Sequence, residues 1–411
     1  MPPFLISLIG LGKMGESILH HLMKSNIARL AVAADIDLSK AERVLQKAGA
    51  KFSIVHSIEE AERIVESGLI ALTNDSGLAV ELPGVQVVID ATGNVIAGAE
   101  IALRAILARK NIVMLNAEAD ATVGPILSKI ARSIGVVYTG DIGDEPGTIM
   151  HYLYRPLTEI GLEVVVAGKG KNNPLNPRAT PSDLAEEAAR KKLNPRVLTS
   201  FVDGTKTMVE MTILSNATGL LPDIRGMHGP RASLSDLVKI FRLKSDGGIL
   251  ESFGVVDYVI GIAPGVFTIA RSDDDVIIEN LRYLGVGNGP TFLFYRPYHL
   301  PGSETILAAM HSIRYGEAVI SPKGCFSEAV TVAKKELHPN EVLDGIGGFT
   351  VYGTIERREI AREEGLLPVG LAEGCIMRRS KRAGETITLD DVEIPSNMLY
   401  DLWNLQQKYF K

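Results

Sequence analysis

The segment that most constrains the fold is an apolar run that leads directly into a glycine-rich turn. Residues 4–9 (FLISLI) are typical of a β-strand, and residues 10–15 (GLGKMG) then carry glycines in the order G-x-G-x-x-G before an amphipathic stretch. In a strand–turn–helix unit the first glycine allows the tight turn, the second lets the backbone approach a pyrophosphate, and the third lets the helix pack closely on the strand. The pattern predicts a dinucleotide-binding turn whose cofactor contacts are Gly10, Gly12, Lys13, Met14 and Gly15.

A carboxylate follows at the distance that such a turn requires. A second apolar run, Leu30 to Ala34, ends in Asp35, about 20 residues after the last glycine. A carboxylate at this place hydrogen-bonds the adenosine ribose and repels a 2′-phosphate, which favours NAD over NADP. Lys40 lies close enough to soften that preference. The alternative interpretation is that Asp35 only supports the start of the next helix.

Strands and helices are expected to alternate over residues 1–140. Apolar runs separated by amphipathic segments predict a parallel sheet covered on both faces, which is a Rossmann-type doubly wound α/β domain. Ala91, Thr92 and Gly93 follow an expected strand at Val85–Asp90 and are predicted to pass over the nicotinamide ribose. The other expected strands are Phe4–Ile9, Leu30–Ala34, Asn111–Leu115 and Val136–Tyr138.

The remainder of the chain divides into three parts. Residues 141–330 mix strands and helices and are predicted to form an α+β catalytic domain. Residues 331–395 contain short apolar segments and turns, with a weak internal echo between 335–343 and 381–389, which predicts a small β module. Residues 396–411 have helical spacing, with an apolar stripe expected to pack in the core or against another subunit.

Composition excludes several classes of partner. The net charge is −6, so neither nucleic acid nor an anionic membrane is expected as the main partner. The two cysteines are too few for a disulfide framework and suit a reducing compartment, so we expect a cytoplasmic protein. We find no basic leader segment and no apolar run of transmembrane length.

Polar clusters follow several of the expected strands, where loops commonly carry functional groups. Asn116 and Glu118 are candidates for contacts with the substrate, or else they support the next helix. Asp144 and Glu145 lie in a glycine-rich acidic turn that either holds a divalent cation or is a solvated turn. A donor-rich stretch suited to an anionic or polyhydroxy substrate contributes Lys169, Lys171, Asn172 and Asn173.

The strongest candidate for proton transfer is Lys206. It lies on an expected helix with Glu210 one turn further on and Asp203 just before it. A lysine in a partly dry cleft can donate a proton to an alkoxide as it develops. We therefore predict that Lys206 is the general acid or base, oriented by Asp203 and Glu210, while Glu118 completes the site. The alternative is an ordinary Lys–Glu salt bridge. His151 and His228 are weaker candidates, more often structural.

These motifs together resemble the oxidoreductases related to 1-deoxyxylulose-5-phosphate reductoisomerase (the DRL family). The resemblance rests on GLGKMG at 10–15, DATGN at 90–94, NAE at 116–118, GDEPG at 143–147, GKGKNN at 168–173 and DGTK…E at 203–210. The N-terminal part is also similar to homoserine dehydrogenases, and residues 331–395 resemble an SAF (antifreeze-like) module. In the reductoisomerases the loop reads N-K-E and an acidic turn with a later glutamate binds a metal. Here Ala117 replaces the lysine, and the acidic turn lacks the D-x-E-H-S form.

The sequence therefore predicts an NAD(P)-dependent oxidoreductase that acts on a carbonyl or secondary alcohol of a small polar substrate, with or without a phosphate group. If a metal is used, Mg²⁺ or Mn²⁺ is expected at Asp144 and Glu145. One alternative is a reductoisomerase that converts 1-deoxyxylulose 5-phosphate. Another is a non-catalytic protein that senses a nucleotide or binds a carbohydrate. The resemblance also implies a homo-oligomer.

Overall fold

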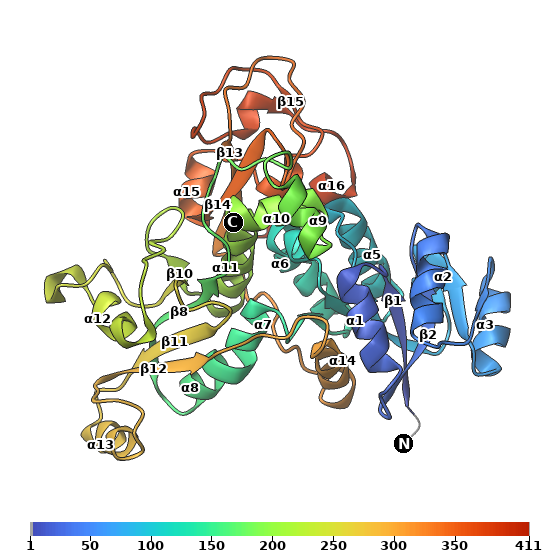
Figure 1. The fold of residues 1–411 in the computed structure, drawn as a ribbon, viewed down its shortest axis with the longest axis horizontal. Helices are drawn as coiled ribbons and strands as arrows, with labels where there is room; N and C mark the ends of the chain where they lie inside the picture. The colour runs from blue at the N-terminus through green and yellow to red at the C-terminus, as the bar shows by residue number, and fades with distance from the viewer. Residues whose placement is uncertain (1–2, 411) are drawn as a thin grey trace.

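The computed structural model describes residues 3–410, which form three lobes around a common centre (Figure 1). The first lobe contains a seven-stranded parallel sheet in the order β3-β4-β2-β1-β5-β6-β7. The predicted Rossmann-type sheet is therefore confirmed. Its strands are β1 (Phe4–Ile9), β2 (Ala28–Ala34), β3 (Phe52–Ile54), β4 (Ile70–Thr73), β5 (Val85–Asp90), β6 (Asn111–Met114) and β7 (Tyr138–Gly140).

Strands β3 and β4 are additions to the sequence-based prediction. They are only three and four residues long, which is too short for a clear periodic signal. The helices of this lobe are α1 (Lys13–Leu22), α2 (Leu38–Lys47), α3 (Ile58–Glu66), α4 (Ser76–Glu81), α5 (Val95–Leu107) and α6 (Ala117–Ile134). Helix α6 begins at Ala117, directly after Asn116, because the Asn116 side chain caps it by accepting from the backbone N–H of Ala119.

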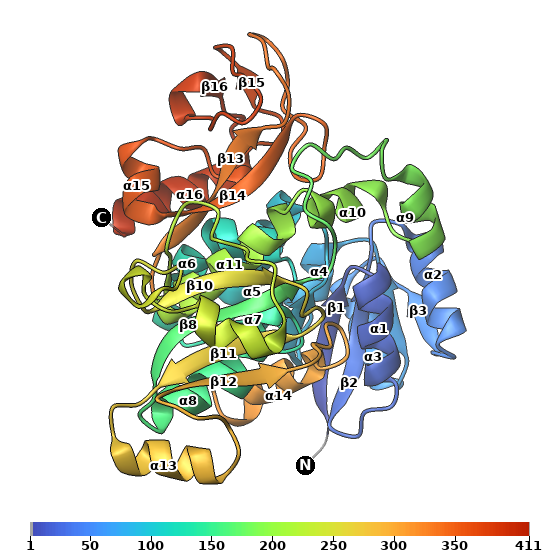
Figure 2. The ribbon, with the colours of Figure 1, turned by 60° about the vertical axis from the view of Figure 1, so that its left-hand side comes forward.

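The second lobe is built on a mixed five-stranded sheet in the order β12-β11-β8-β10-β9. Its strands are β8 (Glu163–Lys171), β9 (Leu221–Pro222), β10 (Val255–Ile260), β11 (Val266–Arg271) and β12 (Thr291–Arg296). The segment before the sheet forms α7 (Glu145–Ile149), a π-helical turn (Met150–Tyr154) and α8 (Arg155–Glu159). Later helices are α9 (Ala185–Lys191), α10 (Pro195–Val202), α11 (Thr205–Thr218), α12 (Leu237–Ile240) and α13 (Asp275–Tyr283). Figure 2 shows α13 projecting beyond β12.

The third lobe is a small β module. It contains an antiparallel pair, β13 (Ser327–Ala333) with β14 (Val351–Arg357), then α15 (Arg358–Glu363) and a short pair, β15 (Ile376–Met377) with β16 (Val392–Glu393). The predicted echo has a structural counterpart, since Leu337 and Lys381 form an antiparallel bridge between the two segments. Each segment also carries the same turn, in which Glu341 accepts from the N–H of His338 and Glu385 accepts from that of Arg382.

Two distant helices return to the first lobe. Helix α14 (Thr305–Arg314) packs beside α1 and against β5, β6 and β7, while α16 (Met398–Tyr409) packs against α5 and α6. One hydrophobic core consequently contains residues of the parallel sheet, of the β module and of α16. Among residues 3–410, no helix is both long enough and apolar enough to cross a membrane.

Candidate active site

A cleft of about 860 Å³ lies where the three lobes meet. The glycine-rich turn and the loop after β5 line one part of it, and β8, α7 and α11 line another. The β module contributes the wall that includes Ile346, Val369, Gly370 and Glu373. Of the predicted site residues, the lining contains Gly12, Lys13, Met14, Ala91, Thr92, Gly93, Glu118, Asp144, Glu145, Lys169, Lys171, Asn172, Asn173, Lys206 and Glu210.

The three glycines of the turn have different steric surroundings. Gly10 has φ +94°, and a Cβ there would lie 2.7 Å from the Ala91 carbonyl. A Cβ on Gly15 would lie 1.9 Å from the Gly10 oxygen, so α1 packs directly on the turn. A Cβ on Gly12 would meet no atom within 4 Å. Gly12 is therefore the one of the three glycines whose missing side chain leaves open space in the cleft.

Asp35 lies at the end of β2 and braces the same turn. Its carboxylate accepts from the backbone N–H of Leu11 at 2.7 Å and from that of Asp37 at 3.0 Å, and it lies 3.4 Å from the Lys40 ammonium. Lys40 lines the cleft, whereas Asp35 does not. This arrangement supports the turn and places one cation beside the carboxylate.

Two buried polar side chains, Asp90 and Asn116, fix the loop after β5 through hydrogen bonds. Asp90 accepts from the backbone N–H of Thr92 at 2.9 Å and from its hydroxyl at 2.6 Å. The Asn116 amide donates to the carbonyl oxygen of Asn94 at 2.8 Å. Burial raises the pKa of Asp90 to about 6. Asn116 therefore caps α6 and fixes the loop, and the cleft does not expose it.

The chemical centre of the cleft is a cluster of carboxylates and ammonium groups. Oxygens of Asp144, Glu145 and Glu210 all lie within 4.8 Å of one another. The Lys169 ammonium forms ion pairs with both Glu145 and Glu210, and all three side chains are almost fully buried. The Nε2 atom of His299 lies 3.4 Å from Glu145. The oxygens suit a hard divalent cation, but an ammonium already contacts two of the three carboxylates, so an added ion does not fit this arrangement.

The pKa values in the cluster move in opposite directions. Burial raises the pKa of Asp144 well above its usual range, and the charges of Glu145 and Glu210 raise it further. Burial acts on Glu145 in the same sense, but the Lys169 ammonium and, to a lesser extent, the neighbouring His299 outweigh it and lower the pKa of that carboxyl. The pKa of Glu210 is raised by burial and by Glu145. The cluster therefore combines a proton-bearing carboxyl with an ionised one.

Lys206 reaches into this cluster from α11. Its ammonium lies 3.3 Å from Glu118 Oε1 at the start of α6. Burial lowers the pKa of Lys206, but Glu118, Asp144 and the neighbouring carboxylates outweigh that effect and raise it overall. Lys206 is thus held as a proton-bearing ammonium.

The predicted donor loop is partly strand. Strand β8 extends to Lys171 and so includes both lysines of that stretch, which places Lys169 and Lys171 on one face. Gly168 and Gly170, on either side of Lys169, contact backbone on the other face: an added Cβ would lie 1.9 Å from Asp257 O and 2.6 Å from Ala263 N, respectively. Lys171 donates to Phe201 O at 2.6 Å, and burial beside Lys169 lowers its pKa to about 8.

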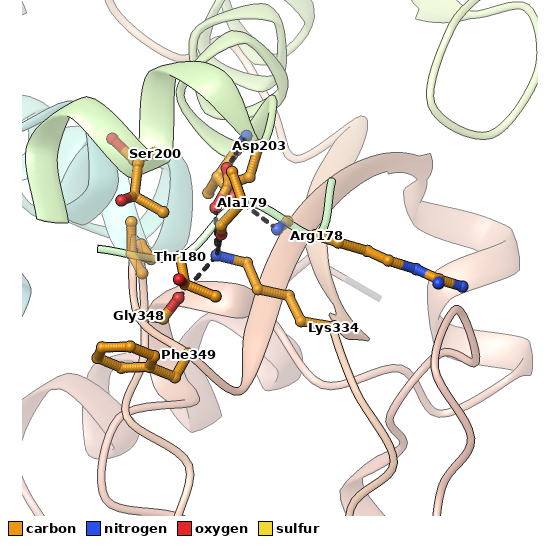
Figure 3. A network of polar contacts seen from close by, with 12 residues as sticks. Arg178, Ala179, Thr180, Ser200, Asp203, Lys334, Gly348 and Phe349 are labelled. Carbon is orange, nitrogen blue, oxygen red and sulfur yellow. Dashed lines mark hydrogen bonds and ion pairs between the residues drawn. The ribbon is translucent and has the colours of Figure 1, made fainter. Parts of the chain in front are cut away.

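Asp203 lies outside the cleft, contrary to its predicted place beside Lys206. It is fully buried behind the start of α11, where it pairs with Lys334 of the β module at 2.8 Å and accepts from the N–H of Thr205. The same ammonium donates to the carbonyl oxygens of Ala179 and Gly348 (Figure 3). Sequence proximity to Lys206 was misleading because the Asp203 side chain turns away at the junction of α10 and α11.

Several cleft residues escaped the sequence analysis. His299 follows β12 and joins the cluster only through folding, while His151 and His228 do not line the cleft. Arg196 binds the carbonyl oxygens of Asp344 and Ile346, which joins α10 to the β module. Lys192 also lines the cleft at the end of α9. None of these residues stands in a local motif, so only the tertiary structure identifies them.

Comparisons with known proteins identify a family for one part of the chain and give only distant similarity for the rest. Residues 143–305 match the family model described as "Oxidoreductase DRL, catalytic domain", which confirms the resemblance for that part of the chain. No curated protein matches the sequence. Three solved structures show low identity and modest similarity. A probable dehydrogenase from Thermotoga maritima is 14% identical, with 77% of this chain and 90% of that chain covered and a TM-score of 0.44.

The second structure is scyllo-inositol dehydrogenase from Lactobacillus casei, solved with NAD(H) and scyllo-inositol. It is 14% identical, with 65% and 73% of the chains covered and a TM-score of 0.38. The third is DOX-P reductoisomerase with fosmidomycin and magnesium, which is 14% identical, with 77% and 71% covered and a TM-score of 0.43.

Proposed function

We propose that this protein is an NAD(P)-dependent oxidoreductase that acts on a carbonyl or secondary alcohol of a small polar substrate. The observation that carries the proposal is the continuity of the cleft. A single cavity is lined by bare Gly12 of the dinucleotide-type turn and by the Lys206 ammonium. The match of residues 143–305 to an oxidoreductase catalytic domain supports the same reaction class. When bound, the nicotinamide supplies the hydride.

Lys206 is the proposed proton donor for reduction. Its charge is held by Glu118 and by the carboxylates of α7 and α11, so the ammonium can protonate an alkoxide forming beside it. Glu118 orients the ammonium.

The cationic part of the cleft favours an anionic substrate. Lys171, Lys192 and Arg196 line it together with the amides of Asn172 and Asn173. Such groups can hold a phosphate or carboxylate through charge-assisted hydrogen bonds. The first substrate to test is therefore 1-deoxyxylulose 5-phosphate, the substrate of the alternative reductoisomerase activity.

The test combines cofactor binding with turnover. Fluorescence titration with NADH and NADPH measures binding, and loss of reduced-nicotinamide absorbance measures turnover with 1-deoxyxylulose 5-phosphate and then with small polyols and hydroxy acids. Lys206→Ala should lower turnover by about 10²-fold or more while leaving cofactor affinity nearly unchanged. Gly12→Val should abolish cofactor binding without unfolding the protein, since its side chain enters open space.

Two results would contradict the proposal. Absence of nicotinamide binding by folded wild-type protein excludes the cofactor. Full activity in Lys206→Ala excludes Lys206 as the proton donor. Binding of NADH without turnover on any substrate would instead favour the non-catalytic, nucleotide-sensing alternative.

A further inference from the structure

Lys169 has a position that a simple substrate-binding role does not explain. Its side chain is 6% exposed and its ammonium contacts Glu145 on α7 and Glu210 on α11. These are two of the three carboxylates whose oxygens converge within 4.8 Å. A divalent cation at this place would use the same oxygens. The ammonium and such an ion therefore compete for one location.

The strand that carries Lys169 keeps it there. Strand β8 is paired on both sides, with Lys169 opposite Tyr258 of β10 and opposite Val266 of β11. The glycines on either side of Lys169 pack against backbone, so the strand cannot shift without a clash. The side chain consequently enters the cluster from a fixed point in the middle of a sheet.

Displacing the ammonium would also be unfavourable. A lysine that loses its partners inside a protein is left as an uncompensated buried charge. The adjoining place on the same face is taken by Lys171, a second cation, which donates to Phe201 O. Like charge therefore opposes movement of the Lys169 ammonium along the strand towards Lys171.

We propose that the ammonium of Lys169 takes the place of a divalent cation between Glu145 and Glu210, and that this site works without Mg²⁺ or Mn²⁺. The ammonium offsets the repulsion between the two carboxylates and holds α7, β8 and α11 in register. The inference deepens the proposed function of the same cleft. Its test measures metal binding, so it can fail or succeed independently of hydride transfer.

The experiment is a titration of metal-free protein with Mn²⁺, in which electron paramagnetic resonance reports the free ion. Wild type should bind no Mn²⁺ at this cluster up to about 1 mM. Lys169→Met removes the charge and keeps the length of the side chain, so it should raise Mn²⁺ affinity by about tenfold or more. Adding Glu210→Gln to that variant should abolish the gain. Lys171→Met, on the same strand face, is the matched control and should leave Mn²⁺ binding unchanged.

Two outcomes overturn the inference. The first is wild-type binding of one Mn²⁺ with a dissociation constant below about 1 mM that Glu210→Gln removes. The second is a folded Lys169→Met variant that gains no Mn²⁺ affinity, because the carboxylates would then not form a cation site. If that variant does not fold, the melting temperature of the wild-type protein decides. An equal melting temperature in EDTA and in MnCl₂ supports the proposal. A higher melting temperature in MnCl₂ that Glu210→Gln removes overturns it.

Discussion

At the scale of single residues, a buried carboxyl makes the stability of the fold depend on pH. Asp120 is fully buried in α6, where it accepts from the Tyr138 hydroxyl at 2.8 Å, and burial raises its pKa to about 6. Its folded-state pKa lies above the unfolded value, so this carboxyl stabilises the fold at low pH. That stability is lost as the pH rises from about 4 through about 6, by about 3 kcal/mol in total.

Asp120→Asn should therefore stabilise the protein at a pH above the folded-state pKa of about 6 and have little effect at a pH below the unfolded-state pKa of about 4. We expect a gain of about 1–3 kcal/mol in the free energy of unfolding at pH 7.5 and about none at pH 4, measured by urea denaturation. The amide oxygen can still accept from Tyr138. An equal change at both pH values would show that packing rather than ionisation governs the site.

The sequence predicts that one residue, Asp35, governs the choice between NAD and NADP. Asp35 accepts from the backbone N–H of Leu11, and a carboxylate at the end of the second strand is predicted to repel an adenosine 2′-phosphate. We expect wild type to bind NADH more tightly than NADPH. Asp35→Asn should narrow that difference by about tenfold, since the amide oxygen can still brace Leu11 but no longer repels the phosphate. Fluorescence titration of both cofactors checks this, and tighter NADPH binding by wild type would contradict it.

At the scale of elements, Lys334 joins β13 to the start of α11 and to the loop after β8 (Figure 3). Lys334→Met should destabilise the fold by about 3–5 kcal/mol, because it leaves Asp203 as an unpaired buried charge. The neighbouring Lys335 is half exposed and pairs only with Glu341. Lys335→Met should therefore change stability by less than about 1 kcal/mol. Urea denaturation of both variants measures the two losses in the free energy of unfolding. Equal losses would show that the buried Lys334–Asp203 pair does not stabilise the fold more than the exposed pair does.

The same element scale explains what the sequence could predict. Residues that follow strands of the parallel sheet, such as Thr92 after β5 and Glu145 after β7, could be assigned to one site because parallel strands end at a common edge. Lys171 is the last residue of β8 in the other sheet, so this rule does not place it. Helix α11 was predictable, so Lys206 and Glu210 could be placed on it. Asp203 could not, since its direction depends on a buried partner more than one hundred residues away. His299 could not either, because an irregular segment carries it.

At the scale of the whole molecule, the predicted sections are not independent units. The apolar stripe of α16, expected to serve the core or another subunit, packs within the chain: Leu399, Leu402 and Trp403 join the core of the parallel sheet. This stripe therefore gives no support to an oligomer, which remains a proposal to be tested by measuring the mass in solution. Residues of the β module lie in the same core, and the module also lines the cleft.

Shared cores predict that the lobes unfold together, because one core joins the first and third lobes and a second contains residues of all three. Trp403 is the only tryptophan and is 6% exposed, in a helix that packs on α5 and α6. Its fluorescence should therefore change at the same urea concentration as the far-ultraviolet circular dichroism of the whole chain. If α16 and the β module were merely appended, the tryptophan would report an earlier, separate transition. Coincident midpoints are expected because separating the module would expose one face of the sheet's own core, at a cost that rises with the apolar area uncovered.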